Sequence, residues 1–562
     1  MAHADRVWTA ERAFAINAEP DSGWRSLAAW RVERIGAPLA VVVSVIYWAV
    51  TLLLARRKLM WNDELYTYYI AILPSMRDVW GALLAKGDQT PPFFYIVTRL
   101  ALRLFGISSI SIRLPEMVAF WGMSACLFVT VRRRMTPLSA LCAALVPCVT
   151  FAYRYAFEAR SYGLVLGFAA AAYLSWQSLA FHKNRTLWLG CLVLSLAAAA
   201  SSHYYAMFVL LPLAAGELVR SATRRRFDLA VWIAFALSVV PLAWQLPLIR
   251  AGTDYSGAFW SPPQWVKIPD FYVDLLTPAL VPFVAILVIC GIVAVLTRDR
   301  LAARSRAIAL PLDEVAAAIG FIVIPVITVI AAKLVTGAFV NRYALPAVIG
   351  FSVLAGFGSA SALGRNALMR LLVVTSICGW FVLSQARELI QPTEATLPVS
   401  VESIARPATW LEAVPAAYRE LPLVIADPQT FATLSHYGVR EIRTRIVYLA
   451  DPDRALARLG TNSVERGMLD LLKPWFHFNV VPFEPFVATH AEFLVYGDFG
   501  RLAFINWIVP ELHAQGMQTE LLNSAGGYML LRAYRRDNTS SGVSADRSHG
   551  ASARPMRMAS MQ

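Results

Sequence analysis

Long apolar segments, separated by short polar or basic stretches, fill the first two thirds of the chain. A helix needs about 20 apolar residues to cross a bilayer, and somewhat fewer where neighbouring helices or a thin bilayer help. Such segments occur at 37–55, 115–131, 136–153, 161–181, 186–200, 204–220, 228–249, 274–297, 314–334, 343–363 and 371–387. The pattern therefore predicts a polytopic α-helical membrane protein with about 11 transmembrane helices within residues 36–389.

Basic residues gather in every other loop between these segments, and this alternation predicts the orientation. The clusters are Arg132 to Arg134, Lys183 with Arg185, Arg220 with Arg224 to Arg226, Arg298 to Arg306, and Arg365 with Arg370. Cytoplasmic loops carry an excess of Lys and Arg, and the N-terminal segment 1–35 is also rich in Arg. We therefore predict a multi-pass protein of the inner (plasma) membrane, with residues 1–35 in the cytoplasm and the C-terminal part on the periplasmic, extracytoplasmic side.

Composition agrees with a membrane location. Of the 562 residues, 57% are hydrophobic and only 16% are charged, which excludes an ordinary soluble protein. The formal net charge is +14, but the excess lies in loop clusters rather than on one face, so we expect no nucleic-acid partner. The six cysteines fall inside predicted spans without metal-ligand spacing and are interpreted as packing residues.

One apolar run is not counted as a span. Residues 91–106, PPFFYIVTRLALRLFG, carry Arg99 and Arg103 four positions apart. This spacing favours an amphipathic helix in the outer interface over a helix that crosses the membrane. If the run did cross, the later loops would change sides. With the interfacial interpretation, residues 56–114 form a long first outer loop.

The pattern changes after about residue 390. Short apolar runs at 421–427, 444–449, 491–497 and 526–534 have the character of strands, and stretches with helical spacing lie between them. This alternation predicts an extracytoplasmic α/β domain over residues 390–536 with a partly parallel sheet. No Gly-rich phosphate loop opens its helices, which argues against a nucleotide site there. Residues 537–562 are polar and poor in aromatics, and we expect them to be disordered.

Two adjacent carboxylates, Asp63 and Glu64, stand at the start of the first outer loop, in the string KLMWNDELYTYYI. Acidic residues at the end of a span often simply face water. Here aromatic residues surround the pair, and aromatics suit the wall of a pocket between water and lipid. Other outer loops carry FEARSYG (157–163), SSHYY (201–205) and NRYALP (341–346). Candidate chemistry therefore gathers on the outer face of the predicted membrane domain.

These motifs resemble a known superfamily. The strings WNDELYT, QTPPFFYIVTRLALRLFG, SIRLPEMVAFWG, FEARSYG, SSHYYA and NRYALP follow one another in this order between residues 61 and 346. Together they resemble the GT-C superfamily of polyprenyl-phosphate-sugar-dependent glycosyltransferases. The nearest branch is the protein mannosyltransferase and aminoarabinose (lipid A) transferase-like group. The resemblance covers about residues 35 to 365, and each motif is short.

The resemblance implies a reaction and a set of catalytic residues. A sugar would move from a polyprenyl-phosphate-linked donor to an acceptor hydroxyl, with inversion. The Asp-Glu motif corresponds to Asp63 and Glu64, and Asp63 is the preferred general base. Because the donor is a phosphate diester, the polyprenyl phosphate departs as an anion, and this leaving group needs cations rather than a proton donor. We therefore expect the active site to contain one carboxylate as the base and positively charged side chains near the leaving phosphate.

The same motifs supply candidate cations. Arg160 and Arg342 lie at the outer ends of predicted spans, where a guanidinium can bind phosphate oxygens in a forked arrangement. The alternative is that these arginines reach lipid headgroups or that Arg160 pairs with Glu158. Glu158 is either a second active-site carboxylate or the orienting partner of Arg160. Tyr343, which follows Arg342, is included among the candidate donor-binding residues.

Three further positions complete the candidate site. Many members of the family have a basic residue directly before the Pro-Pro pair, whereas this chain has Thr90, and Lys86 is a candidate substitute. His203 and Tyr204 are candidates for sugar contact, although an interfacial His beside aromatics is more often an anchor. Asp63, Glu64, Glu158 and His203 carry oxygen and imidazole groups that can ligate a divalent ion, but they show no ligand spacing of the HExxH kind to support a metal site. We therefore commit to no metal and to no other cofactor.

Two other function classes compete with the transferase. A lipid or sugar transporter or flippase typically shows internal repeats and charges at the membrane midplane, and neither is visible in the sequence. A catalytically inactive scaffold of the same fold is the other alternative, favoured by Thr90 at a position that is basic in the family. The sequence names neither the sugar nor the acceptor, which can be a lipid, a glycan or a protein.

Overall fold

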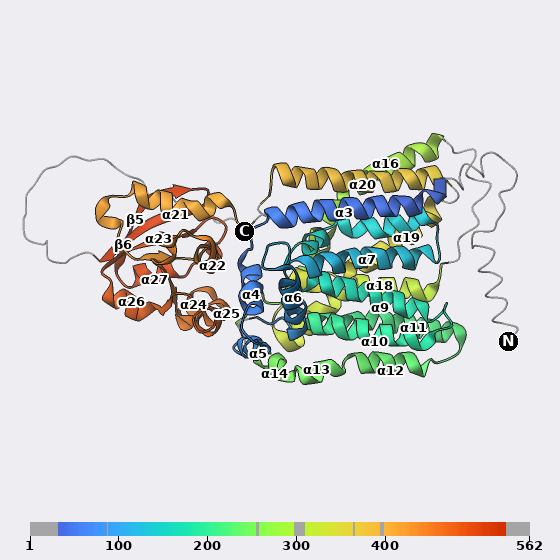
Figure 1. Cartoon of the computed structure of the whole chain (residues 1–562), viewed down its shortest axis with the longest axis horizontal. Helices are drawn as coiled ribbons and strands as arrows, with labels where there is room; N and C mark the ends of the chain where they lie inside the picture. The colour runs from blue at the N-terminus through green and yellow to red at the C-terminus, as the bar shows by residue number, and fades with distance from the viewer. Residues whose placement is uncertain are drawn as a thin grey trace, which may run out of the picture.

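A computed structural model describes residues 32–86, 88–253, 258–296, 310–363, 366–393 and 398–535. Most of the predicted cytoplasmic segment 1–35, the basic cluster around residues 298–306 and the predicted disordered tail 537–562 lie outside the described residues. The described chain forms a helical bundle followed by a domain with a β-sheet (Figure 1).

The bundle consists of apolar helices that run side by side and roughly parallel to one another (Figure 1). Its long helices are α3 (Gly36–Arg57), α7 (Leu114–Arg132), α9 (Tyr162–Ser178), α10 (Arg185–Ser202), α11 (Leu210–Arg224), α16 (Leu280–Leu296), α18 (Leu312–Ala331), α19 (Ala347–Leu363) and α20 (Ala367–Ile390). Shorter pieces complete it: α8 (Pro137–Leu145), α12 (Leu229–Ser238), α13 (Val240–Trp244), α14 (Leu246–Thr253) and α15 (Lys267–Leu276).

The polytopic helical fold is confirmed, and every predicted apolar segment coincides with one or more of these helices. By length and composition, 7 helical spans of the described part can cross a membrane, and the bent pair at 229–244 and 246–253 would be an eighth. The predicted count of about 11 includes shorter helices such as Pro137–Val149. That count stays a prediction.

Three short helices fill the predicted first outer loop. They are α4 (Asn62–Ala71), α5 (Met76–Leu84) and α6 (Pro92–Phe105). Helices α4 and α6 lie across the end of the bundle that faces the sheet domain (Figure 1). At 14 residues, α6 is only about 21 Å long. This length and direction support the interfacial interpretation of residues 91–106. The buried Arg99 also explains the interrupted apolar run, because its Nη1 donates to the carbonyls of Ala71 and Leu73 at the end of α4.

The C-terminal domain contains one 6-stranded sheet in the order β3-β2-β1-β4-β6-β5. The strands are β1 (Leu423–Ile425), β2 (Ile446–Ala450), β3 (Val480–Pro482), β4 (Glu492–Asp498), β5 (Met517–Ala525) and β6 (Tyr528–Arg535). Strands β3, β2, β1 and β4 are parallel, whereas β6 runs antiparallel to β4 and β5. The partly parallel sheet is as predicted, and β3 and β5 are additional strands.

Helices connect and cover this sheet. They are α21 (Val401–Ala413), α22 (Pro428–Tyr437), α23 (Arg440–Arg443), α24 (Pro452–Leu459), α25 (Ser463–Gly467), α26 (Phe483–Thr489) and α27 (Ile508–Ala514), with the short turn η9 (Ala503–Ile505). The buried strands β1 and β2 have apolar side chains on both faces, as expected of parallel strands covered by helices.

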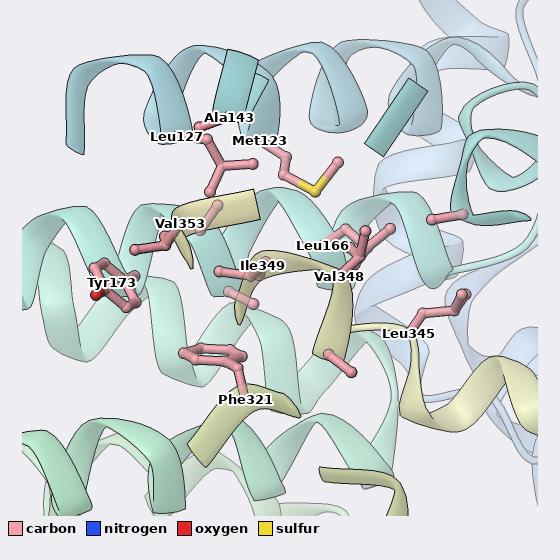
Figure 2. Packing of buried hydrophobic residues seen from close by; sticks show 14 of the residues in the cluster. Met123, Leu127, Ala143, Leu166, Tyr173, Phe321, Leu345, Val348, Ile349 and Val353 are labelled. Carbon is pink, nitrogen blue, oxygen red and sulfur yellow. The ribbon is translucent and has the colours of Figure 1, made fainter. Parts of the chain in front are cut away.

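The core of the bundle is packed around α7, α9, α18 and α19. Met123, Leu166, Phe321 and Ile349 point toward one another from these four helices (Figure 2) and are fully buried. Small residues let the helices approach closely, as is common in membrane proteins. A Cβ atom at Gly350 would lie 2.2 Å from the carbonyl oxygen of Ala318.

The two parts of the molecule are joined by direct contacts. The backbone N–H of Met60 donates to the Tyr437 hydroxyl at 2.9 Å, and the Tyr69 hydroxyl lies 2.9 Å from Nδ1 of His436. A second junction lies nearby, where the N–H of Asn462 donates to the carbonyl of Ala258 at 3.3 Å. The sheet domain therefore packs against α4, at the end of the bundle where the first outer loop lies.

Candidate active site

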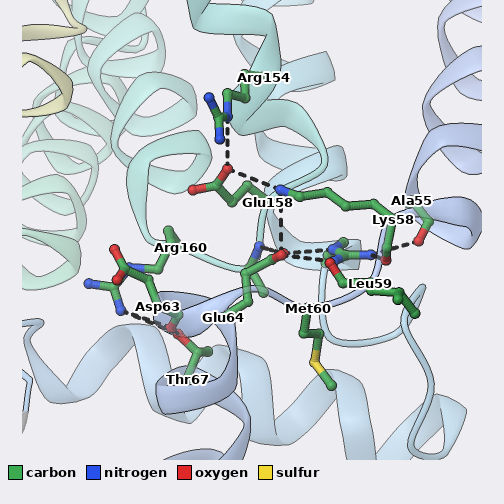
Figure 3. A network of polar contacts seen from close by, with 12 residues as sticks. Ala55, Lys58, Leu59, Met60, Asp63, Glu64, Thr67, Arg154, Glu158 and Arg160 are labelled. Atoms are coloured by element: carbon green, nitrogen blue, oxygen red, sulfur yellow. Dashed lines mark hydrogen bonds and ion pairs between the residues drawn. The ribbon is translucent and has the colours of Figure 1, made fainter. Parts of the chain in front are cut away.

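Helix α4 presents its two acidic residues in different directions. The chain is extended at Trp61 and turns into the helix at Asn62, so both acids fall in the first turn, where the helix dipole favours negative charge. Adjacent residues of an α-helix point about 100° apart. Asp63 and Glu64 therefore enter separate environments, and Figure 3 shows them directed to different neighbours.

Glu64 belongs to a buried ion cluster. It accepts from Nε and Nη2 of Arg113 at 2.7 and 2.8 Å and from the backbone N–H of Ala159 at 2.8 Å. Nζ of Lys58 lies 3.4 Å from Oε2 of Glu64, the oxygen that also accepts from Nη2 of Arg113. Burial by itself would raise the pKa of Glu64, but the charges of Arg113 and Lys58 outweigh it and hold the pKa at about 2. Glu64 is thus charged at neutral pH, and its ion pair with Arg113 links α4 to the start of α7.

Glu158 extends this cluster rather than pairing with Arg160. Lys58 donates to it at 3.0 Å and Nε of Arg154 at 3.3 Å, as Figure 3 shows. Burial raises the pKa of Glu158, and the stronger attraction of Lys58 and Arg154 brings it below the usual value. The backbone N–H of Ala159, the residue after Glu158, donates a hydrogen bond to the Glu64 carboxylate. The FEARSYG loop is therefore anchored to α4 through buried charges.

Asp63 faces a different partner. Nη2 of Arg342, from the NRYALP motif, lies 3.0 Å from its carboxylate, and both side chains keep partial exposure of 16–17%. Nη1 of Arg160 also approaches the main chain here, 3.4 Å from the carbonyl oxygen of Asp63. Residues separated by almost 280 positions in the sequence are thus brought together at the N-terminus of α4.

Arg160 is held by a carboxylate that the sequence did not single out. Its Nη1 donates to Asp88 at 2.7 Å and its Nη2 lies 3.3 Å from the Thr90 hydroxyl. Thr90 in turn donates to Asp88 through both its hydroxyl and its backbone N–H, at 2.9 and 3.1 Å. Burial would raise the pKa of Asp88, but Arg160 and the hydrogen bonds lower it. The Thr90 side chain therefore stands beside a guanidinium.

These groups share one cavity of about 350 Å³ between the bundle and the sheet domain, a size typical of small-molecule sites. Of the predicted residues, Asp63, Lys86, Thr90, Arg160, His203, Tyr204, Arg342 and Tyr343 line it. Glu64 and Glu158 are not among the lining residues. Buried nitrogens without a hydrogen-bond partner occur on Trp61, Arg160 and Arg342, so the wall retains unused donors.

Aromatic rings form one side of the cavity. The His203 ring lies 4.8 Å from that of Tyr343 and 5.3 Å from that of Tyr162, measured between centroids. Its Nδ1 accepts from the backbone N–H of Tyr205 at 3.3 Å. Burial, and then the charges of Arg160 and Arg342, lower the pKa of His203 to about 3. His203 is therefore neutral at pH 7 and adds no positive charge.

Sequence reasoning missed Asp88, Lys58 and Arg113. Asp88 lies two residues before Thr90 and could have been noticed from that proximity, but its pairing with Arg160 depends on the fold. Within the described ranges, no group of three or more His, Cys, Asp or Glu side chains is arranged to hold a metal ion.

The sequence was compared with models of protein families and with curated proteins. The sequence model of the dolichyl-phosphate-mannose-protein mannosyltransferase family matches residues 89–249, a region that contains Thr90, Arg160 and His203. A comparison with curated proteins finds no match.

Solved structures add a match over most of the chain. The crystal structure of ArnT from Cupriavidus metallidurans in the apo state superposes with a TM-score of 0.51 at 14% identity, over 88% of this chain and 97% of ArnT. The structure of ArnT bound to undecaprenyl phosphate gives 0.51 at 12% identity, over 88% and 98%. At these identities the likeness concerns the fold. The family match, the shared fold and the ordered motifs agree: the chain resembles the GT-C superfamily glycosyltransferases of the ArnT and protein mannosyltransferase group.

Proposed function

We propose that the protein is a membrane glycosyltransferase that moves a sugar from a polyprenyl-phosphate-linked donor to an acceptor hydroxyl, with inversion at the anomeric carbon. The observation that carries this proposal is the cavity itself. The partly exposed carboxylate of Asp63 pairs with the guanidinium of Arg342, and the guanidinium of Arg160 lies 3.4 Å from the main-chain carbonyl oxygen of Asp63. All three side chains line one space of about 350 Å³. The likeness to ArnT, whose structure was solved with undecaprenyl phosphate, supports a polyprenyl phosphate as the donor lipid.

In this reaction Asp63 acts as the general base. Its carboxylate takes the proton of the acceptor hydroxyl, the acceptor oxygen forms a bond to the anomeric carbon, and the bond from that carbon to the phosphate oxygen breaks. The polyprenyl phosphate leaves with the bonding electron pair. Since that anion needs no proton, the cavity requires positive charge near the leaving group rather than an acid. Arg160 and Arg342 supply that charge.

Donor binding also frees the base. Asp63 is paired with Arg342 at 3.0 Å, and a carboxylate held by a guanidinium is a poor proton acceptor because its lone pairs are engaged. A donor phosphate competes for Arg342 with two or more oxygens. Asp63 would then turn toward the acceptor. Arg160 keeps its fixed orientation because Asp88 and Thr90 hold it.

We place the cavity on the outer, periplasmic face of the inner membrane. Support comes from the positions of basic residues along the helices. Helix α7 begins beside the Glu64 cluster and ends at Arg132, and α11 ends at Arg224, so these basic termini lie at the end of the bundle away from the cavity (Figure 1). Positive residues favour the cytoplasmic side, which leaves the cavity and the sheet domain outside.

The transporter and scaffold alternatives have less support. A transporter site near the middle of the bundle would need polar residues that face a path through it, whereas the cavity lies at one end beside α4. The alternative of a catalytically inactive scaffold rests on Thr90, which stands directly before the Pro-Pro pair, where many members of the family have a basic residue. Arg160, 3.3 Å from the Thr90 hydroxyl, and Lys86 on the cavity wall provide positive charge at that place.

The decisive experiment is the substitution Asp63→Asn. Removing a general base lowers the rate by about 10²- to 10⁴-fold, while the amide keeps the size of the side chain. We expect cells that express this variant to lose the sugar modification seen with the wild type, when their envelope lipids, glycans and glycoproteins are compared by mass spectrometry. The matched control is Asp270→Asn, an exposed aspartate of α15 that does not line the cavity.

Protein level and thermal stability in detergent are measured for both variants. If the Asp63→Asn variant retained near wild-type modification, Asp63 would not be the general base. A cell without the gene whose envelope shows no missing sugar would remove the glycosyltransferase proposal altogether.

A further inference from the structure

The cavity has two walls of different chemistry. The membrane domain contributes every cation among the described lining residues, namely Lys86, Arg160 and Arg342. The sheet domain contributes residues from α22, α25 and η9, including Gln429, Ser463 and Phe504, and its described lining residues carry no charge. The neutral His203 adds none to the membrane-domain wall. Among the described lining residues, positive charge is therefore confined to the membrane-domain wall.

Each wall of the cavity contributes one large ring that remains exposed, Trp260 from the membrane domain and Phe504 from the sheet domain. Phe504 is 66% exposed and Trp260 is 42% exposed, and both line the cavity. Trp260 belongs to the loop after α14, and its backbone N–H lies 3.3 Å from the Ser463 hydroxyl. This contact ties the loop to α25, so the Trp260 ring lies where the two domains meet, whereas Phe504 comes from η9 of the sheet domain. Exposed rings beside an amide and a hydroxyl are the usual surface for a sugar, which stacks its C–H face on a ring and hydrogen-bonds through its hydroxyls.

We infer that the rim formed by Trp260, Gln429, Ser463 and Phe504 is the acceptor subsite, and that the acceptor group it binds is an uncharged saccharide. This inference rests on the proposed glycosyltransferase function. A phosphorylated or carboxylated acceptor group would need a basic partner on this wall, because an anion that leaves water requires a compensating charge. The three cations of the other wall serve the donor phosphate. The sheet domain is then part of the active site and selects the acceptor.

The test separates acceptor use from donor-lipid binding. The probe for the donor side is undecaprenyl phosphate, bound to the purified full-length protein in detergent and measured by native mass spectrometry. The readout for the acceptor side is the sugar modification in cells. For the double variant Gln429→Ala/Phe504→Ala, we expect about a tenfold or larger loss of modification, which corresponds to one aromatic contact plus one hydrogen bond. Undecaprenyl phosphate binding should stay within about twofold of the wild type.

Two further variants calibrate the measurement. Leu521→Ala removes an exposed apolar side chain of the same domain that does not line the cavity, and it should change neither readout. Arg342→Ala should weaken both, since Arg342 faces the donor. Equal loss of lipid binding in the double variant would show that the rim serves the donor, and unchanged modification would show that the rim binds nothing the reaction needs. Either result overturns the inference.

The class of acceptor is tested by the molecule that lacks its sugar in cells without the gene. An uncharged saccharide as the group that receives the sugar supports the inference, and a phosphorylated or carboxylated group there overturns it. Failure of the proposed function looks different: no missing sugar appears, and the wild type and Asp63→Asn behave alike. A wild type that modifies its acceptor while the double variant does so equally well refutes the subsite alone.

Discussion

At the scale of single residues, two neighbouring carboxylates lie in separate environments. Asp63 lines the cavity and has one charged partner at 3.0 Å, whereas Glu64 is fully buried between Arg113 and Lys58. The sequence predicted the pair together as catalytic, since the motif shows only that the residues are adjacent. Their division follows from the helix, which turns about 100° between them.

Glu64→Gln is therefore expected to destabilise the protein. It leaves Arg113 and Lys58 buried with less negative charge, and breaking a buried ion pair from one side typically costs about 3–5 kcal/mol. Because the pKa of Glu64 is about 2 and its ordinary value is 4.5, this contribution is complete above pH 4.5 and is lost only as the pH falls toward 2. Thermal unfolding in detergent at pH 7 measures the effect, with Asp63→Asn as the comparison. A Glu64→Gln protein as stable as the wild type would contradict this assignment.

At the scale of helices and strands, the sequence predicted what a regular pattern encodes. Apolar length located the helices of the bundle, and short apolar runs located β1, β2, β4 and β6. Strand β3 was missed because it has only three residues and ends in Pro482. Strand β5 was missed because most of its residues are exposed, so its apolar positions show no alternation. The site residues Asp88 and Arg113 were missed for another reason, since pairings over 49 or more positions leave no local signal.

The contact of α18 with α19 gives a prediction at this scale. A Cβ atom at Gly350 would meet the Ala318 carbonyl oxygen at 2.2 Å and the Ile322 side chain at 2.9 Å. Gly350→Ala must push the two helices apart, and overpacking of this kind costs about 1–3 kcal/mol. Gly358→Ala on the same helix has open space around the new atom and serves as the matched control. The unfolding midpoint in detergent should fall for the first variant and not for the second. Equal midpoints would refute the close approach.

Helix α22 gives a pH-dependent prediction. Asp427 caps its N-terminus by accepting from the N–H of Thr430 at 2.8 Å, and it also accepts from the N–H of Asp498. Burial raises the pKa of Asp427 from its ordinary 3.8 to about 6, against the effect of these hydrogen bonds. The folded state therefore holds the proton more tightly than the unfolded state. This contribution to stability appears as the pH falls through about 6 and is lost as the pH rises.

The comparison is between the wild type and Asp427→Ala, a change that removes a cap worth about 0.5–2 kcal/mol. We expect the wild type's advantage in unfolding midpoint to be larger at about pH 5 than at about pH 8. The full chain in detergent is followed by tryptophan fluorescence, since Trp507 is buried in the same domain. An advantage that grows toward high pH would have the wrong sign and would rule out a raised pKa.

At the scale of the whole molecule, the proposed function depends on which side of the membrane the cavity faces. The residues proposed to bind the donor phosphate, to act as base and to bind the acceptor all line the cavity between the bundle and the sheet domain. The side of the membrane on which that domain lies therefore decides which acceptors can reach Asp63. Positive residues at the far helix ends favour the cytoplasm for that end. Single introduced cysteines can test this directly. Asn184→Cys lies in an exposed position at the start of α10, and Gln518→Cys lies in an exposed position on β5.

A membrane-impermeant maleimide added to intact spheroplasts should label Gln518→Cys and leave Asn184→Cys unlabelled until the membrane is opened. The wild type is the control for its own thiols, which are buried or half-buried in the bundle where they are described. Labelling of Asn184→Cys alone would invert the topology. Asp63 would then face the cytoplasm, and only an acceptor made and held inside the cell could be its substrate. The proposed periplasmic transfer would have to be abandoned even if Asp63→Asn were inactive, because the base would be on the wrong side of the membrane.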